Sequence, residues 1–228
     1  MLTGYPELIS GFSTRPDGTM ALQGGFDNRQ QYLQSRGLDP KRTIHAGLVH
    51  GATTTIVTAQ QGGKVVEATD GLITAEANLG LAMTAADCLL ISVYDPQQQV
   101  IGLVHAGSKG LAAEVITAFL TTWRAAFTGD PQGFIVDISP SICSEHYPVA
   151  SDFASKYSEW PEACEKRGDS VHLDLRRIAR TQLIAGGVVK EHITASPDCT
   201  YKDERYFSYR RDHPTESQLQ VGYLLRRD

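Results

Sequence analysis

The sequence is poor in cysteine, and its cysteines lack the spacing of disulfide scaffolds and zinc knuckles. It has 4 cysteines among 228 residues, and no two of them form a C-x-x-C pair. Scattered cysteines disfavour both a disulfide-stabilised scaffold and a four-thiolate zinc site. Reduced thiols are typical of the cytoplasm, so we expect a cytoplasmic location and interpret Cys143, Cys164 and Cys199 as buried thiols.

Long apolar runs and an excess of basic residues are also lacking. No apolar segment approaches the roughly 18 residues of a membrane-spanning helix, and residues 1–10 do not resemble a signal peptide. The formal net charge is −5 and the pI is near 5.8, so no basic stripe for a nucleic-acid polymer is expected. We therefore expect a small-molecule partner, no membrane or nucleic-acid partner, and a monomer or small homo-oligomer.

Internal repeats and low-complexity linkers are absent too, and apolar segments instead alternate between strand-like and helix-like patterns. This pattern predicts one mixed α/β domain over residues 1–228. Helices are expected at 28–36, 111–127 and 171–185, the last opened by Asp174. Strands are expected at 53–58, 64–67, 71–74, 79–84, 88–94, 100–105, 134–138, 192–196 and 219–225.

The two most apolar strands are separated by a short turn and predict a hairpin. A turn centred between Pro96 and Gln97 places Cys88 opposite His105. Opposed residues lie on one face, about 4.5–5.5 Å apart. A thiol and an imidazole at that distance suit a shared metal or a nucleophile–base pair, although each is also common as a structural residue.

Further polar groups gather at the open end of this hairpin. A glycine-bracketed turn after His105 leads into the helix predicted from residue 111, which favours an anion there, and Lys109 adds a positive charge. His50 is a sensible third metal ligand. Two histidines and one cysteine leave a fourth position for water, as in catalytic zinc sites, where the metal lowers the pKa of that water.

Several blocks of this sequence occur in the same order in one known family. They resemble the signature blocks of the YfiH-like, laccase-domain family, long labelled polyphenol oxidoreductase and associated with purine nucleoside phosphorolysis. The blocks are GFSTR at 11–15, LVHG at 48–51, TAADC at 84–88, HAGSKG at 105–110, DCTY at 198–201 and FSYRRD at 207–212.

The resemblance implies an α+β fold, in which a single domain is built on a central β-sandwich of mixed sheets flanked by helices. It also implies a catalytic zinc on His50, Cys88 and His105; copper suits this single-metal ligand set less well. The implied reactions are cleavage of adenosine, inosine, guanosine and methylthioadenosine with phosphate, and deamination of adenosine. The older family label implies phenol oxidation.

The blocks depart from the usual family pattern around the substrate. Leu48 replaces a glutamine, and Ser108-Lys109 replaces Trp-Arg, which removes a stacking surface and a bidentate phosphate ligand. After Arg211-Asp212 the family commonly continues to Thr-Gly-Arg, whereas Thr215-Glu216-Ser217 here lacks that arginine. The metal ligands are therefore intact, whereas the substrate surroundings differ.

Other polar residues in these blocks have expected roles in catalysis and substrate binding. Asp87 is expected to move protons or to orient a ligand histidine. Arg15, Lys109 and Arg210 are candidates for holding phosphate, and Tyr209 for stacking on the base or merely packing.

Two rival functions stay open. One is a metal-free cysteine hydrolase in which Cys88 is the nucleophile and His105 the base. The other is a zinc-stabilised binding domain without turnover. His146, His172, His192 and His213 are interpreted as ordinary histidines.

Overall fold

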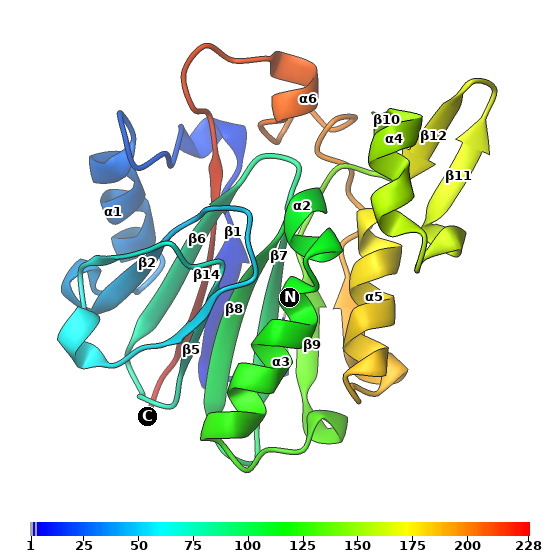
Figure 1. The fold of residues 1–228 in the computed structure, drawn as a ribbon. Helices are drawn as coiled ribbons and strands as arrows, with labels where there is room; N and C mark the ends of the chain where they lie inside the picture. The colour runs from blue at the N-terminus through cyan, green and yellow to red at the C-terminus, as the bar shows by residue number, and fades with distance from the viewer. Residues whose placement is uncertain (1, 3) are drawn as a thin grey trace.

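The computed structural model describes residue 2 and residues 4–228, and most of its strands form two sheets that face each other (Figure 1). In the first sheet, β1 and β6 flank β14 in antiparallel pairs, and β2 runs parallel to both β6 and β4. Its order is β1 (Leu8–Phe12), β14 (Gln220–Arg226), β6 (Gly80–Ala85), β2 (Thr43–Gly47) and β4 (Val65–Glu67).

The second sheet is antiparallel in its centre and parallel at both outer pairs. Its order is β13 (Ile193–Ala195), β9 (Ile135–Ile138), β7 (Leu89–Asp95), β8 (Val100–Ala106), β5 (Gly71–Thr74) and β3 (Thr54–Ile56). A small third sheet contains β10 (Pro148–Val149), β12 (Ser170–Leu173) and β11 (Cys164–Arg167).

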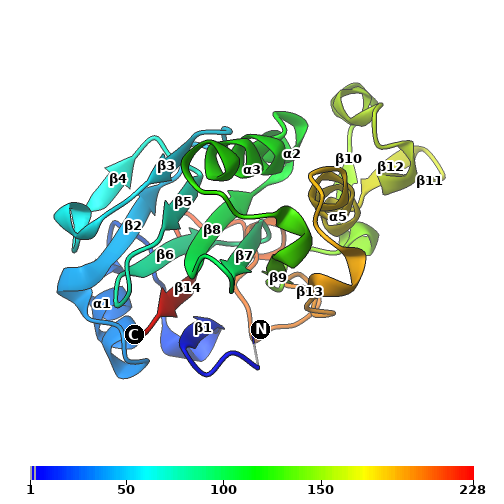
Figure 2. The same cartoon turned by 90° about the horizontal axis from the view of Figure 1, so that it is seen from below.

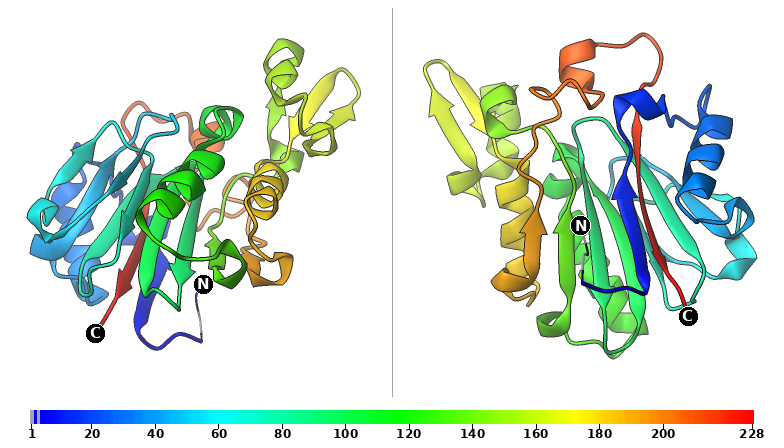
Figure 3. Two further views of the ribbon diagram at one scale, coloured as in Figure 1. Left: turned by 60° about the horizontal axis from the view of Figure 1, so that its bottom comes forward. Right: turned by 180° about the vertical axis from the view of Figure 1, so that it is seen from behind.

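Helices cover the outer faces of the two facing sheets (Figure 2). The first sheet is covered by α1 (Phe26–Ser35), and the second by α3 (Val115–Ala126) and α5 (Leu175–Ala185). The short helix α2 (Ser108–Ala112) precedes α3. At one end of the molecule lie α6 (Tyr209–Asp212) and, beside the small third sheet, α4 (Ser151–Ala154) (Figures 1 and 3).

The central strands are apolar along their whole length because both of their faces are buried. In β7, Leu89, Ile91 and Val93 pack toward the helices, whereas Leu90 and Tyr94 pack between the sheets. Two buried faces require a nearly continuous apolar run.

The predicted α+β architecture, a β-sandwich flanked by helices, is confirmed. Within the described residues, no helix combines the length and the apolar character that crossing a membrane would require.

Two helix predictions need correction. The helix expected at 111–127 is two helices, because Glu114 adopts a left-handed conformation (φ 55°) that ends α2 before α3 begins. The helix expected at 171–185 begins only at Leu175, because the preceding residues form β12. Asp174 does open this helix: its carboxylate accepts a hydrogen bond from the Arg177 amide at 3.0 Å.

The predicted hairpin exists, but its register is shifted by two residues. Its turn has four residues, 96–99, so Leu90 and not Cys88 faces His105. Cys88 lies just before β7 and next to Gly107. The strands β1, β2, β10, β11 and β12 were not predicted.

Candidate metal centre

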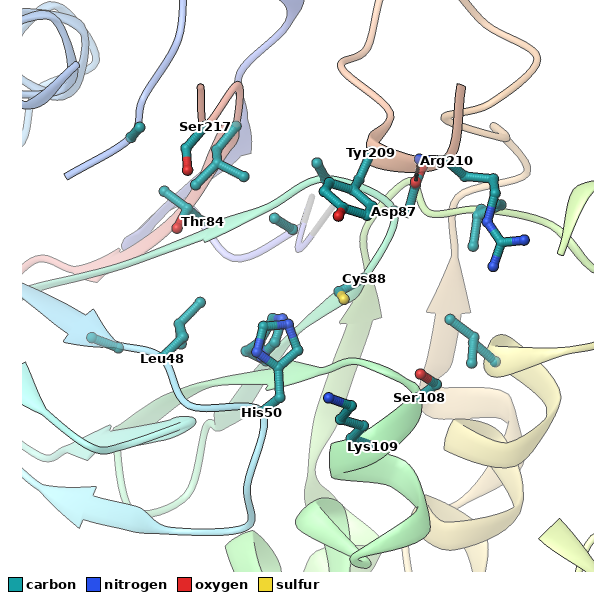
Figure 4. A pocket seen from close by; sticks show the side chains of 18 of the residues that line it. Leu48, His50, Thr84, Asp87, Cys88, Ser108, Lys109, Tyr209, Arg210 and Ser217 are labelled. Carbon is teal, nitrogen blue, oxygen red and sulfur yellow. Dashed lines mark hydrogen bonds between the residues drawn. The ribbon is translucent and has the colours of Figure 1, made fainter. Parts of the chain in front are cut away.

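A pocket of about 750 Å³ opens at the end of the sandwich where the β6–β7 turn and the end of β8 meet (Figure 4). Its walls come from distant parts of the chain, because strand ends from both sheets converge there. They include residues 21–23, the loop after β2, the β6–β7 turn, the junction of β8 with α2, the start of α6, and Ile142 and Tyr147 from the segment between β9 and β10.

The three predicted metal ligands lie together in this pocket. His50 comes from the loop after β2 and Cys88 from the entry to β7 (Figure 4). His105 comes from β8. One ligand atom from each lies within 4.8 Å of the others. The two imidazole rings meet nearly at right angles (89°), with centroids 4.8 Å apart. Exposure increases from buried His105 through half-buried Cys88 to exposed His50.

Asp70, which the sequence analysis missed, fixes both histidines. Its fully buried carboxylate lies 3.0 Å from Nδ1 of His105. It also accepts hydrogen bonds from the backbone amides of His50 (3.0 Å) and Gly51 (2.8 Å). His50 adopts a left-handed conformation (φ 57°), which turns two successive amides toward one carboxylate. The only sequence signal was an acidic residue directly before an apolar strand.

The electrostatics of the site favour a thiolate. Burial alone would raise the pKa of Cys88, but the charge and hydrogen bonds of His105 and His50 lower it to about 6. Burial would lower the pKa of His105, yet Cys88 and Asp70 raise it to about 9. Hydrogen bonds from His105 and the Gly51 amide outweigh burial and lower the pKa of Asp70. A negative sulfur at neutral pH is the form that binds metals.

The donor set fits a transition metal. Thiolate and imidazole are ligands that zinc accepts, and three protein ligands leave a fourth position open. Because Asp70 engages Nδ1 of His105, Nε2 of that ring is the nitrogen left for a metal. This carboxylate–histidine pair is the arrangement found around ligating histidines in general.

Asp87 lines the pocket but does not contact His105 through any of its hydrogen bonds. Its carboxylate accepts hydrogen bonds from the Thr200 hydroxyl (2.6 Å) and the Arg210 amide (2.8 Å). These bonds fasten the start of α6 over the pocket, which Asp87 also lines. The carboxylate that orients His105 is Asp70 instead.

The predicted substrate residues divide into two groups. Lys109, Tyr209 and Arg210 line the pocket, and the Arg210 guanidinium lies over the Tyr147 ring, 5.0 Å from its centroid. Arg15 is not among the described lining residues, because its guanidinium pairs with the Asp212 carboxylate.

A family model described as multi-copper polyphenol oxidoreductase laccase matches residues 23–223. The chain belongs to this laccase-like family. Its identity to a purine nucleoside phosphorylase of Streptomyces coelicolor is 34%, over 93% of this chain and 90% of the relative. Its identity to purine nucleoside phosphorylase YlmD of Geobacillus stearothermophilus is 31%, over 96% of this chain and 90% of the relative.

Solved structures of the family share this fold. The crystal structure of YlmD from Geobacillus stearothermophilus superimposes with a TM-score of 0.92 at 28% identity, covering 98% of this chain and 93% of the other. That of the Bacillus licheniformis hypothetical protein YfiH gives 0.90 at 24% identity, covering 96% and 93%. The predicted YfiH-like membership is confirmed.

Proposed function

We propose that this protein is a zinc-dependent purine nucleoside phosphorylase acting in the pocket around His50, Cys88 and His105. The convergence of these three ligands within 4.8 Å in a pocket of about 750 Å³ carries the proposal. Pockets of that size accommodate a ligand as large as a nucleoside with phosphate. The names of the relatives support the purine nucleoside as substrate.

The choice of zinc follows from the ligands. A blue-copper site also uses two histidines and one cysteine, but it adds a weak axial ligand, usually methionine. Among the described residues that line the pocket there is no methionine. Zinc bound here would supply a Lewis acid that polarises a substrate oxygen or nitrogen.

The residues around the metal site have separate tasks in phosphorolysis. A phosphate oxygen forms a bond to the anomeric carbon of the ribose while the bond from that carbon to the purine nitrogen breaks. Lys109 and Arg210 bind the phosphate, since both line the pocket and carry a positive charge. Asp87 positions Arg210 through its hydrogen bond to the Arg210 amide. Tyr209, 65% exposed at the rim, covers the base.

The proposed substrates are adenosine, inosine, guanosine and methylthioadenosine. Leu48 and Ile142 contribute apolar walls that suit a purine face. Adenosine deamination is a second reaction for the same pocket. Asp87 favours it, because it is the carboxylate among the described lining residues and could move a proton to the leaving amine.

A metal-free cysteine hydrolase is the competing function, and one observation favours it. The contact of Asp70 with His105 supplies the orienting third member that a Cys88–His105 pair requires. The two functions differ at His50, which is a ligand in the first and dispensable in the second.

Release of hypoxanthine from inosine, with and without phosphate, tests the proposal on zinc-loaded protein. We expect phosphate-dependent release that falls at least about 100-fold in His50→Ala and Cys88→Ser, because each removes a metal ligand. Lys109→Met should raise the KM for phosphate, and Cys164→Ser, outside the pocket, should match wild type. Phosphate-independent hydrolysis retained in His50→Ala would favour the hydrolase.

A further inference from the structure

A second group of metal-ligating side chains lies outside the pocket. It consists of Cys143 and His146, from the segment between β9 and β10, and Cys199, from the loop after β13. One ligand atom from each lies within 4.8 Å of the others. None of the three is among the described residues lining the pocket, so this cluster shares no ligand with the first.

The backbone holds the two segments together independently of any metal. Ser141 and Cys199 form an isolated parallel bridge, and the Thr200 amide donates to the Ser141 carbonyl at 3.0 Å. From α5, the Arg176 guanidinium donates to the carbonyls of Ser141 and Asp198. The residues beside both cysteines are therefore fixed before a ligand arrives, which reduces the entropy lost on binding.

The histidine ring is oriented toward both sulfurs. His146 stacks on Tyr201, with ring centroids 4.6 Å apart and planes 18° from parallel. Its Nδ1 lies 3.2 Å from Sγ of Cys143 and 3.7 Å from Sγ of Cys199. One nitrogen thus faces two sulfurs, and a single proton on it can bond well to only one of them at a time.

These separations match the edges of a tetrahedral zinc site. With Zn–S near 2.3 Å and Zn–N near 2.0 Å, tetrahedral angles place sulfur and nitrogen about 3.5 Å apart. The observed distances of 3.2 and 3.7 Å lie on either side of that value. The C-x-x-H spacing of Cys143 and His146 also lies within the short ligand spacings of zinc sites.

We infer that Cys143, His146 and Cys199 bind a second zinc ion, separate from the one proposed in the pocket. Two thiolates and one imidazole form a soft donor set that suits zinc and leaves a fourth position toward solvent, since Cys143 and His146 are only half-buried. The ion would join the segment that leads to Tyr147 with the segment that leads to Arg210. Both of these residues line the pocket, so the second zinc would brace one of its walls.

Zinc counting by native mass spectrometry tests this inference. Full-length protein is reduced, loaded with zinc sulfate and freed of excess metal, and its far-UV circular dichroism is compared with wild type. We expect two zinc ions in wild type, one in Cys143→Ser, one in Cys88→Ser, and none in the double variant. Cys164→Ser is the matched control and should retain two, because Cys164 belongs to neither group.

His146→Ala provides an independent test, because it removes a half-buried ring and not a cysteine beside a backbone bridge. We expect one zinc ion, with circular dichroism unchanged. Cobalt loading of Cys88→Ser should produce sulfur-to-cobalt absorption that disappears in the Cys88→Ser/Cys143→Ser variant.

Equal zinc counts in wild type, Cys143→Ser and His146→Ala would overturn the inference. A second contradicting result has two parts. The oxidised protein would contain a Cys143–Cys199 disulfide, seen as a loss of about 2 Da, and the reduced protein would bind a single zinc ion that Cys88→Ser removes. Failure of the pocket proposal gives a different result: the zinc count in Cys88→Ser would equal that in wild type.

Discussion

Asp70 connects both histidines of the pocket site without being a ligand. It holds the ring of His105 directly and the backbone of His50 through its amide. Since the carboxylate is fully buried, its bonds are not shared with bulk water. Asp70 therefore sets the geometry of the ligands.

Asp70→Asn should weaken zinc binding about 10- to 100-fold, because the isosteric amide keeps the shape but removes the charge that orients His105. Competition with a chromogenic chelator measures the affinity. Asp174→Asn is the matched control, since asparagine caps α5 as well as aspartate does. An Asp70→Asn affinity equal to wild type would contradict this role.

Gly107 is a second residue on which the geometry of the pocket site depends, because a side chain there would collide with Cys88 and His50. A Cβ on Gly107 would lie 2.8 Å from Sγ of Cys88 and 3.2 Å from Cδ2 of His50. Its φ of −79° is open to any residue, so the backbone tolerates alanine. The glycine leaves room for the ligands.

Gly107→Ala should reduce the zinc affinity and phosphorolysis at least about 10-fold with little loss of folding stability, because the added methyl group displaces Cys88 and His50, and even changes around a ligand cost that much. Gly133→Ala is the control, as a Cβ there meets nothing within 4 Å. Isothermal titration with zinc gives the affinity. Normal zinc binding by Gly107→Ala would show that the ligands do not pack as described.

At the scale of elements, the break between α2 and α3 depends on one strained residue. Glu114 has φ 55° and ψ 43°, a left-handed conformation that costs a non-glycine residue about 1–2 kcal/mol. The break lets α2 begin at the pocket, which Ser108 and Lys109 line, while α3 packs across the second sheet (Figure 2).

Glu114→Gly should raise the free energy of unfolding by about 1 kcal/mol, because glycine adopts this conformation without strain. Ala125→Gly, at an exposed position inside α3, should lower it by about 1 kcal/mol. Urea unfolding measures both values. Changes of the same sign would contradict the assigned backbone conformation.

Sequence patterns predicted the central elements better than the outer ones. The strands β5, β7 and β8 are continuous apolar runs, because helices or the other sheet cover both faces. In contrast, β2 (Thr-Ile-His-Ala-Gly) has one large apolar residue, Ile44, so its pattern is not apolar enough to recognise. The third sheet was missed because β12 is a short strand joined directly to the cap of α5.

At the scale of the whole molecule, a buried polar pair joins α1 to the first sheet. His45 on β2 is fully buried, and its Nδ1 lies 3.4 Å from Nη1 of Arg29 on α1. Burial and the charge of Arg29 lower the pKa of His45 to about 3. His45 is therefore neutral in the folded protein, whereas it gains a proton below about pH 6.5 when unfolded.

Protonation of the unfolded chain at His45 should accordingly lower the stability by about 2 kcal/mol between pH 7 and pH 5, in addition to the contributions of other titrating groups. Denaturant unfolding at both pH values measures the change, and His45→Gln should remove this component. His213→Asn, which replaces an exposed histidine, should behave like wild type. An unchanged pH dependence in His45→Gln would contradict the assignment.

The three proposed ligands of the pocket could be predicted from short motifs, whereas their surroundings could not. His50, Cys88 and His105 each lie in a recognisable block, but Asp70 reaches His105 across 35 positions of sequence. Cys143 and Cys199 come together across 56 positions, where the Cys143 amide donates a hydrogen bond to Sγ of Cys199. Pairings of this kind depend on the folded topology.

The cytoplasmic location and the monomer or small homo-oligomer stay predictions.

Phosphorus-31 NMR of zinc-loaded protein with inosine and inorganic phosphate tests the central claim most directly, because it observes the bond that phosphorolysis forms. We predict a growing ribose 1-phosphate resonance at the expense of phosphate, absent with Cys88→Ser and retained with Cys164→Ser. Release of hypoxanthine with the phosphate resonance unchanged, or equal formation of the ester by Cys88→Ser, would contradict the account.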